Sequence, residues 1–415
     1  MNNQLPKDWK IVDISSIGRI ETGSTPSKQN TVFYNNDYPF YKPTDLQAGY
    51  NVRIAKDNLS EAGIKQARYL PENSILVTCI GATIGKTGLI RKGGASNQQI
   101  NAIIPAENVE PSFVYYQVIG PVFQKLIKDN ASATTLPILN KTKFRNLPFV
   151  IAPIKKQQQI VSRIEELFSE VDKGIEELKT AQQQLKVYRQ AVLKWAFEGK
   201  LTNKEVKEGE LPAGWKIRSI NEVAFINPKI PNKECIDEDL EIQFLPMKLV
   251  EEIINKFHLT ETKKIKEAQR GSYTPFINGD LIFAKVTPCM ENGKIAVVDN
   301  LKNGVGYGSS EFHVVRCSDQ LLNKFLFYFV VQDRFRNEAQ HAMTGAVGLR
   351  RVPKQFIENH SISLPTISEQ QQIVQEIESR LSVCDKIEET ITNSLKQSEA
   401  LRQSILKKAF EGKFI

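Results

Sequence analysis

The sequence predicts an α/β (α+β) protein in which two modules with small twisted sheets are joined by two long helices, paired as an antiparallel coiled coil. Three observations predict this architecture: a long internal repeat, a heptad pattern within the repeat, and short apolar runs bounded by turn residues elsewhere. A chain of 415 residues is also long for one hydrophobic core and fits about two to four domains.

The internal repeat is the strongest feature of the chain. Residues Gln157–Lys200 and Gln370–Lys413 begin with the same Gln-Gln-Gln-Ile-Val and end with the same Ala-Phe-Glu-Gly-Lys, and 21 of their 44 aligned positions are identical. A Leu-Pro-x-x-Trp opening likewise occurs at Leu5–Trp9 and at Leu211–Trp215. The parts between these anchors are only faintly similar. A repeated frame with divergent contents indicates a scaffold that carries two separately specialised modules.

The repeated segments have the heptad pattern of paired helices. In the first copy the apolar positions are Ile160, Ile164, Leu167, Val171, Leu178, Leu185, Tyr188 and Val192, with Gly174 and Ala181 at the skipped positions. In the second copy they are Ile373, Ile377, Cys384, Ile387, Ile391, Leu401 and Ile405, interrupted by Arg380, Ser394 and Ser398. The small Gly174 and the large Arg380 indicate that the two segments pair with each other. As helices they would each be roughly 66 Å long.

Chain order predicts the orientation of the helix pair. Only about ten polar residues, 201–210, separate the first helix from the second module, and that module runs directly into the second helix. The end of one helix therefore lies near the start of the other, and the pair is expected to be antiparallel. The predicted segments are 1–153 for module 1, 154–200 for helical spacer 1, 201–210 for a linker, 211–365 for module 2 and 366–415 for helical spacer 2.

Each module is predicted to contain a small twisted sheet or partial barrel followed by helix. Strand-like runs occur at Ser74–Ile80 and Asp280–Val286, and helical stretches at Pro111–Lys128 and Asp319–Gln340. We expect the aromatic residues of these helical stretches to be buried in the core. They are Tyr115, Tyr116, Phe123, Phe325, Tyr328, Phe329 and Phe335.

A net charge of +8 and a pI near 9.0 favour a polyanionic partner. Candidate DNA contacts are polar and basic residues in turns, which can reach phosphates or base edges. In module 1 they are Ser24, Thr25, Lys28, Lys42, Lys86, Asn97, Gln98 and Gln99, and in module 2 Lys229, Lys248, Lys285, Lys294, Ser309, Ser310, Arg350, Arg351 and Lys354. The Gln98-Gln99 and Arg350-Arg351 pairs are preferred, because amides pair bidentately with adenine and guanidinium groups with guanine or phosphate. A solvated surface role is the alternative for each residue.

Several catalytic and metal motifs are expected to be absent. Gly81–Thr87 resembles a phosphate-binding loop, but three residues separate its glycines where four are needed, so a tight turn is predicted. Ile226–Lys229 has only one of the two prolines of an amino-methyltransferase motif, and Glu291–Lys294 misses the spacing of a nuclease site. Five cysteines and four histidines, scattered along the chain, suggest free thiols and no metal site. No signal peptide or membrane span is expected, which predicts a cytoplasmic protein.

With its duplicated Leu-Pro-x-x-Trp opening, its strand-turn segments at Ile80–Lys86 and Asp280–Val286, its helix entry at Pro365–Val374 and its Ala-Phe-Glu-Gly-Lys ending, the sequence resembles the specificity subunits of type I restriction-modification enzymes. The resemblance spans nearly the whole chain. It implies a non-catalytic subunit that binds an asymmetric, two-part target in double-stranded DNA, with one half-site per recognition domain and the half-sites roughly 34 Å apart.

The resemblance also implies partners. Two methyltransferase subunits would dock on the helices and use S-adenosylmethionine, while restriction subunits would use ATP with magnesium. Three alternatives are a purely structural coiled coil, a fused restriction-modification enzyme, and a coiled-coil DNA-binding regulator that acts without methyltransferase partners. The fused enzyme would need methyltransferase motifs, which this sequence lacks.

Overall fold

The computed structural model describes residues 5–132, 136–203, 205–207, 209–231, 237–346 and 348–414, so Cys235 lies outside the described residues. The chain divides into two compact units, Met1–Lys179 with Thr392–Ile415 as unit 1 and Thr180–Ile391 as unit 2. Each unit holds one module together with part of both long helices. None of the described helices is long and apolar enough to cross a membrane.

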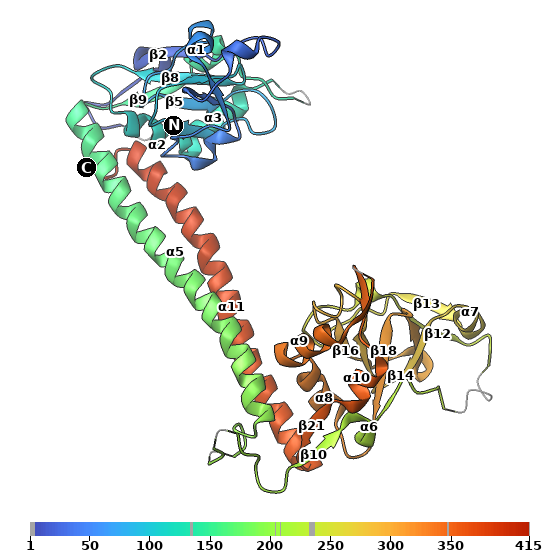
Figure 1. Cartoon of the computed structure of the whole chain (residues 1–415). Coiled ribbons are helices and arrows are strands. Elements are labelled where there is room, and N and C mark those ends of the chain that lie inside the picture. Colours follow the sequence, from blue (N-terminus) through green and yellow to red (C-terminus); the bar gives the residue numbers. More distant parts are fainter. Residues whose placement is uncertain are drawn as a thin grey trace. The chain divides into compact units, whose positions relative to one another are not determined.

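Unit 1 contains two small sheets and a two-stranded ladder (Figure 1). Its strands are β1 (Lys10–Asp13), β2 (Gly18–Thr22), β3 (Tyr38–Tyr41), β4 (Asp57–Leu59), β5 (Ile75–Thr78), β6 (Thr87–Leu89), β7 (Ala95–Ser96), β8 (Ile100–Pro105) and β9 (Pro148–Ile151). Its helices are α1 (Glu61–Gln66), α2 (Pro111–Ile119), α3 (Pro121–Asn130), α4 (Lys141–Arg145), the first part of α5 (Ile154–Phe197) and the last part of α11 (Ile367–Phe410). The sheet orders are β2-β8-β5-β6, β4-β3-β7 and β1-β9.

Unit 2 contains the remaining parts of α5 and α11 and the second module. Its strands are β10 (Lys216–Ser219), β11 (Ala224–Ile226), β12 (Glu241–Leu245), β13 (Glu261–Lys264), β14 (Thr274–Ile277), β15 (Leu281–Ala284), β16 (Ile295–Val297), β17 (Val305–Gly308), β18 (Phe312–Cys317), β19 (Thr344–Ala346), β20 (Leu349–Arg351) and β21 (Ser361–Leu364). Its other helices are α6 (Ile220–Val223), α7 (Ile265–Arg270), α8 (Asn323–Val330), α9 (Asp333–Ala342) and α10 (Lys354–Asn359).

The two modules have the same strand topology. The order β11-β18-β15-β16 repeats β2-β8-β5-β6, and β13-β12-β17 repeats β4-β3-β7 with β14 added at the edge. In both modules the second sheet includes a parallel pair, β3 with β7 and β12 with β17. A common scaffold thus carries sequences that are only faintly similar.

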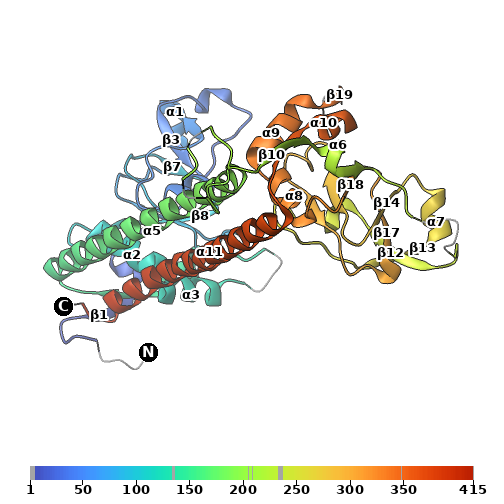
Figure 2. The same ribbon diagram turned by 90° about the horizontal axis from the view of Figure 1, so that it is seen from below.

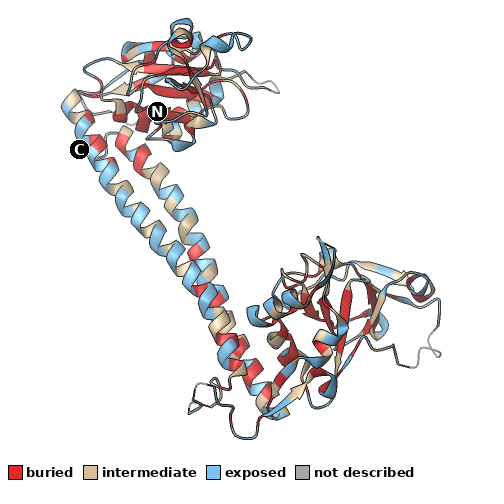
Figure 3. Cartoon of the chain, in the orientation of Figure 1, coloured by how far each residue is buried: buried red, intermediate tan, exposed pale blue. Residues whose placement is uncertain are grey.

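The predicted strand runs form the central strands β5 and β15. All four residues of each strand are buried, Ile-Leu-Val-Thr in β5 and Leu-Ile-Phe-Ala in β15 (Figure 3). A continuous apolar run suits such a strand because both faces of the sheet are covered. The Gly81–Thr87 segment is the tight turn that follows β5, with positive φ angles of 102° at Gly81 and 87° at Gly85.

Each predicted helical stretch is divided into two helices. In unit 1, α2 ends before Gly120 and α3 starts at Pro121, because proline cannot donate the backbone hydrogen bond needed to continue α2. In unit 2, α8 and α9 are separated at Val331 and Gln332. Both pairs of helices supply aromatic side chains to the core, as predicted.

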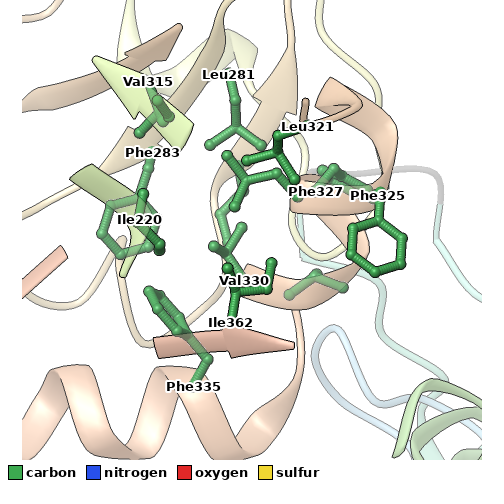
Figure 4. Close-up of a cluster of buried hydrophobic side chains, with 14 of the residues drawn as sticks. Ile220, Leu281, Phe283, Val315, Leu321, Phe325, Phe327, Val330, Phe335 and Ile362 are labelled. Atoms are coloured by element: carbon green, nitrogen blue, oxygen red, sulfur yellow. The ribbon is translucent and has the colours of Figure 1, made fainter. Parts of the chain in front are cut away.

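Each unit has its own principal hydrophobic core. In unit 1 the β5 residues Ile75 and Val77 cluster with Phe113, Phe123 and other side chains of α2 and α3. In unit 2 strand β15 and helices α8 and α9 form the corresponding cluster, drawn in Figure 4. The labelled side chains there are Ile220, Leu281, Phe283, Val315, Leu321, Phe325, Phe327, Val330, Phe335 and Ile362.

The long helices pair in antiparallel fashion within each unit (Figure 2). In unit 1 the start of α5, including Ile160 and Ile164, clusters with the end of α11, including Ile405. In unit 2 the end of α5, including Val192, clusters with the start of α11, including Ile373. Both contacts join the start of one helix to the end of the other, which is the predicted orientation.

One repeated ion pair crosses the helix pair in each unit. Asp172 of α5 pairs with Arg402 of α11 in unit 1, and Arg189 of α5 pairs with Asp385 of α11 at 2.7 Å in unit 2. These residues are repeat counterparts, because Asp172 aligns with Asp385 and Arg189 with Arg402. Each copy of the repeat thus supplies the acidic residue of one ion pair and the basic residue of the other.

Two expectations about the helix seam are wrong. A side chain built at Gly174 would have no atom within 4 Å, so this glycine does not make room for Arg380, which instead binds Glu376 of its own helix at 2.7 Å. Seam residues Tyr188, Ile387 and Leu401 are 39%, 44% and 50% exposed. A two-helix seam covers only a narrow stripe of each helix, so residues at its margin stay in solvent.

The repeated frame motifs fasten each module to the long helices. A Cβ atom at Gly199 would lie 2.1 Å from Pro212, and one at Gly412 would lie 2.5 Å from Pro6, so each helix end closes on a Leu-Pro-x-x-Trp opening. The first glutamine of the Gln-Gln-Gln motif is buried in both copies. Gln157 accepts from the Glu110 amide at 2.9 Å. Gln370 accepts from the Leu322 amide at 2.8 Å.

Candidate DNA-recognition surfaces

In module 1, five of the candidate residues come together where the loop after β2 meets the loop before β8. Thr25 Oγ1 donates to Gln98 Oε1 at 2.7 Å, and Asn97 Nδ2 donates to Gln99 Oε1 at 2.8 Å. Ser24 lies in the same loop as Thr25, directly after Gly23, where a Cβ atom would be 2.1 Å from the Asn97 carbonyl. The close approach of these loops explains the glycine. Thr25 and Gln98 are exposed, whereas Asn97 is buried.

The candidate lysines of module 1 contact a neighbouring segment. Lys42 forms an ion pair with Asp57, and Lys86 Nζ donates to the Thr44 carbonyl at 3.4 Å. The hydrogen bond from Lys42 lowers the pKa of Asp57 below its usual range, and the charge of Lys28 acts in the same direction. Lys42 and Lys28 are thus near the Asp57 carboxylate, and the Lys42 amide also donates to the Asp45 carboxylate at 2.8 Å.

Module 2 brings its loop before β18 next to strand β20. Arg351 of β20 donates to the Glu311 carboxylate through Nε at 2.9 Å and through Nη2 at 2.7 Å. Ser309 and the exposed Ser310 directly precede Glu311. The Lys285 amide donates to the Glu311 carbonyl at 2.9 Å, which places Lys285 beside the same loop.

The remaining candidates of module 2 differ in their surroundings. Arg350 donates its amide to Thr287 Oγ1 at 3.3 Å, and Lys354 pairs with Glu358 at 2.7 Å. The other three candidates have contacts that lead to other segments. Lys248 pairs with Glu261 at 3.6 Å, Lys294 Nζ donates to the Val250 carbonyl at 2.8 Å, and the Lys229 carbonyl accepts from Arg316 at 3.1 Å.

The charges around Glu311 and the buried His313 have defined directions. Hydrogen bonds from Arg351 are the main cause that lowers the pKa of Glu311, so this carboxyl stays ionised. Burial lowers the pKa of His313, and the nearby charges of Lys285 and Lys354 lower it further. The His313 ring lies between the Asn227 side chain at 3.1 Å and the Val352 carbonyl at 2.9 Å.

Three residues of these surfaces lie outside the predicted set of basic and polar turn residues. Leu136 and Ile138 are 52% and 41% exposed and lie in the segment that pairs with Ile80, the second residue after β5. Glu311 is acidic, whereas the predicted set consists of groups that attract phosphate or pair with bases. The sequence could have indicated Glu311 only through its position directly after the candidate residues Ser309 and Ser310.

Among the described residues, no group of three or more histidine, cysteine or acidic side chains is arranged to hold a metal ion. The described cysteines, Cys79, Cys289, Cys317 and Cys384, are free thiols. Burial raises the pKa of Cys79 to about 12. Such a thiol stays protonated and unreactive at neutral pH.

Two modules of one topology, each fastened to the same pair of repeated helices, define a duplicated two-module protein. The chain belongs to the family of the type I restriction modification DNA specificity domain, whose model matches residues 6–181 and again residues 212–397. Each half of the chain thus matches the DNA specificity domain that defines this family.

Some curated relatives match about half of this chain, and others match nearly all of it. The EcoAI specificity subunit of Escherichia coli is 38% identical over 205 residues, a match that spans 49% of this chain and 34% of that subunit. The match thus covers about a third of the length of that relative. The EcoDI specificity subunit of Escherichia coli is 24% identical over 99% of this chain and 89% of its own length.

A solved structure shares the fold. Its subject is the structural basis underlying complex assembly and conformational transition of the type I R-M system. It aligns with a TM-score of 0.73 and 16% identity over 99% of this chain and 100% of its own.

Proposed function

We propose that the chain reads an asymmetric, two-part target in double-stranded DNA, with one half-site per module, and docks two methyltransferase subunits as well as restriction subunits. The observation that carries this proposal is the common scaffold of the modules together with the different side chains on their matching loops. One scaffold supports the same mode of binding, and different side chains support two unlike half-sites.

The chemistry is proposed to belong to the partners. The chain itself would carry no catalytic site, while S-adenosylmethionine would bind to the methyltransferase subunits and ATP with magnesium to the restriction subunits. This assignment follows from the family, and the related structure concerned with type I complex assembly supports docking of this kind.

Exposed residues of the repeated helices support docking of two copies of one partner. Ser169, Lys173 and Glu176 of α5 are exposed, and their repeat counterparts in α11 are the identical and equally exposed Ser382, Lys386 and Glu389. Their spacing of four and three residues puts each trio on one helix face. We call the two trios the repeated polar patches.

The neighbouring exposed positions have diverged. Glu170 aligns with Val383, and Glu177 aligns with Thr390, although all four residues are exposed. Packing therefore does not explain why the polar patches have stayed identical. A partner that binds once to each unit through the same surface does explain it, and two methyltransferase subunits are such a partner.

The direct test combines this chain with its candidate methyltransferase subunit and maps methylated adenines in genomic DNA. A split motif with two unlike halves, found only when both proteins are present, is the expected result. A continuous symmetric motif, or methylation that does not depend on this chain, would contradict the proposal. Tight sequence-specific binding by the chain alone, without methylation, would favour a regulator that needs no methyltransferase.

A further inference from the structure

The hydrogen-bond registers of the two modules match residue by residue around the recognition loops. The Cys79 amide after β5 donates to the Gln99 carbonyl at 2.7 Å, and the Lys285 amide after β15 donates to the Glu311 carbonyl at 2.9 Å. Gln99 and Glu311 each directly precede the strand that pairs with β5 or β15. Glu311 in module 2 therefore occupies the position of Gln99 in module 1.

A second pair of positions matches on the neighbouring segment. The next residue after Cys79, Ile80, forms an antiparallel bridge with Ile138, and the next residue after Lys285, Val286, forms the same bridge with Arg351. Arg351 in module 2 therefore occupies the position of Ile138 in module 1.

Module 1 presents an amide and apolar groups at these positions. A Cβ atom built on Gly81 would lie 3.8 Å from Gln99 Nε2 and 3.8 Å from Leu136 Cδ1, so the Gln99 amide and the Leu136 methyl group converge over this glycine. Leu136 and Ile138, two residues apart, are both more than 40% exposed. The Gln99 amide therefore lies next to exposed apolar side chains.

Module 2 presents a guanidinium and a carboxylate at the same positions. Glu311 holds Arg351 through Nε and Nη2, which leaves the edge formed by Nη1 and the second Nη2 hydrogen. The Arg351 side chain is 42% exposed, so this edge can reach a ligand in solvent. The ion pair fixes the plane of the guanidinium before any ligand binds.

These two sets match the two kinds of base pair in the major groove. A glutamine amide pairs with N6 and N7 of adenine, and apolar side chains contact the methyl group of thymine. An arginine pairs with O6 and N7 of guanine. Module 1 thus has a partner for both bases of an A·T pair, and module 2 has a partner for the guanine of a G·C pair.

We propose that the matching positions 99 with 138 and 311 with 351 are specificity determinants, set for an A·T pair in the half-site of module 1 and for a G·C pair in the half-site of module 2. Arg351 is the guanine-reading residue, and Glu311 is the residue that positions it. Gln99 is the adenine-reading residue, with Ile138 and Leu136 beside the thymine methyl group. This inference rests on the proposed function and adds the class of base pair that each module reads.

The test uses the complete complex of this chain with its methyltransferase subunit. The wild-type motif is determined first, and methylation rates are then measured on duplexes in which each recognised base pair is replaced in turn. Arg351→Lys keeps the positive charge but lacks the planar fork. It should lower discrimination by about tenfold to a hundredfold at one G·C pair of one half-site only. Gln99→Ala should relax one A·T pair of the other half-site.

Two further variants complete the design. Glu311→Gln keeps the shape of the side chain but removes the charge that orients Arg351, so it should relax the same G·C pair as Arg351→Lys. Arg270→Lys is the matched control, because Arg270 is an exposed arginine of module 2 on α7, which follows β13 of the other sheet. It should leave discrimination unchanged at every position.

The outcomes separate this inference from the proposed function. A wild-type complex without a motif that depends on this chain would contradict the proposed function itself. A split wild-type motif that Arg351→Lys and Gln99→Ala leave unchanged would overturn the inference alone. Equal loss of methylation on all duplexes would mark phosphate contacts and would also overturn it, as would effects of both variants on the same half-site.

Discussion

His313 is the residue whose surroundings most clearly link burial to protonation. It is 5% exposed, and its ring nitrogens lie within hydrogen-bond distance of the Asn227 side chain and the Val352 carbonyl. Burial lowers its pKa below the usual 6.5, so the folded protein holds this histidine neutral at pH values where the unfolded chain already binds a proton. Stability is therefore full above about pH 6.5 and falls as the pH drops towards the folded pKa.

His313→Gln should reduce this pH dependence. Glutamine can keep one donor and one acceptor but does not titrate, so the slope of the unfolding free energy of unit 2 below pH 6.5 should decrease by up to about 1.4 kcal/mol per pH unit. Urea denaturation at several pH values, monitored by hydrogen exchange of the β18 amides, measures the slope of the unfolding free energy against pH. Burial also lowers the pKa of His360, so part of the pH dependence will remain in this variant. The exposed His341→Gln is the control, and an unchanged slope in His313→Gln would refute the argument.

The candidate contacts show what residue types can reveal before a structure exists. The sequence predicted Gln99 and Arg351 as candidates, because amides and guanidinium groups in turns are typical of base recognition. Glu311, Leu136 and Ile138 could not be found in this way. Their proposed role comes from the neighbour that each has in space, and neither acidic nor apolar residues stand out in a basic protein.

At the scale of elements, the repeated polar patches give a direct test of docking. Lys173→Glu should remove one methyltransferase subunit from the complex and Lys386→Glu the other, because each replaces the one positive charge of a patch with a negative charge and so breaks the charge complementarity of the interface. Each variant should bind one subunit where the wild-type chain binds two. Sedimentation or native mass spectrometry of the mixed proteins measures the stoichiometry.

Matched controls for this test lie on α5, one in each unit. Lys179 and Lys186 are exposed residues of α5 whose repeat counterparts are Thr392 and Glu399, so their identity was not kept. Lys179→Glu in unit 1 and Lys186→Glu in unit 2 should leave two subunits bound. Equal losses in the control and patch variants would mean that net charge, and no specific patch, determines docking.

The element boundaries were partly predictable. The heptad pattern predicted both long helices, since a 3.5-residue periodicity sustained over many turns is typical of paired helices. The break between α2 and α3 was missed, although Gly120-Pro121 signals it. An apolar stretch on both sides masked that signal, because periodicity continues across a short break.

At the scale of the whole molecule, the chain consists of two compact units with separate principal cores. Phe283 is 2% exposed in the core of unit 2. Phe283→Ala should destabilise unit 2 by about 3–5 kcal/mol, since it removes buried surface and leaves a cavity. Native-state hydrogen exchange should then show faster exchange of the β15 and β18 amides, with the β5 and β8 amides of unit 1 unchanged.

Phe225 offers the control for this experiment. It lies on β11 of the same sheet but is 64% exposed, so Phe225→Ala should change exchange little. Equal acceleration in both units by Phe283→Ala would mean that the long helices unfold the units as one, and would contradict independent cores.

The sequence alone determined the duplication, the two long helices, their antiparallel pairing and the family resemblance, because these depend on periodicity, on identity between repeats and on chain order. Only the tertiary structure decided that the modules share one strand topology, which residues occupy matching places in them, and that Glu311 holds Arg351. The physical reason is that helix pairing depends on the spacing of apolar residues along a short stretch of chain. A recognition surface is instead assembled from loops far apart in the chain, whose contacts no local pattern records.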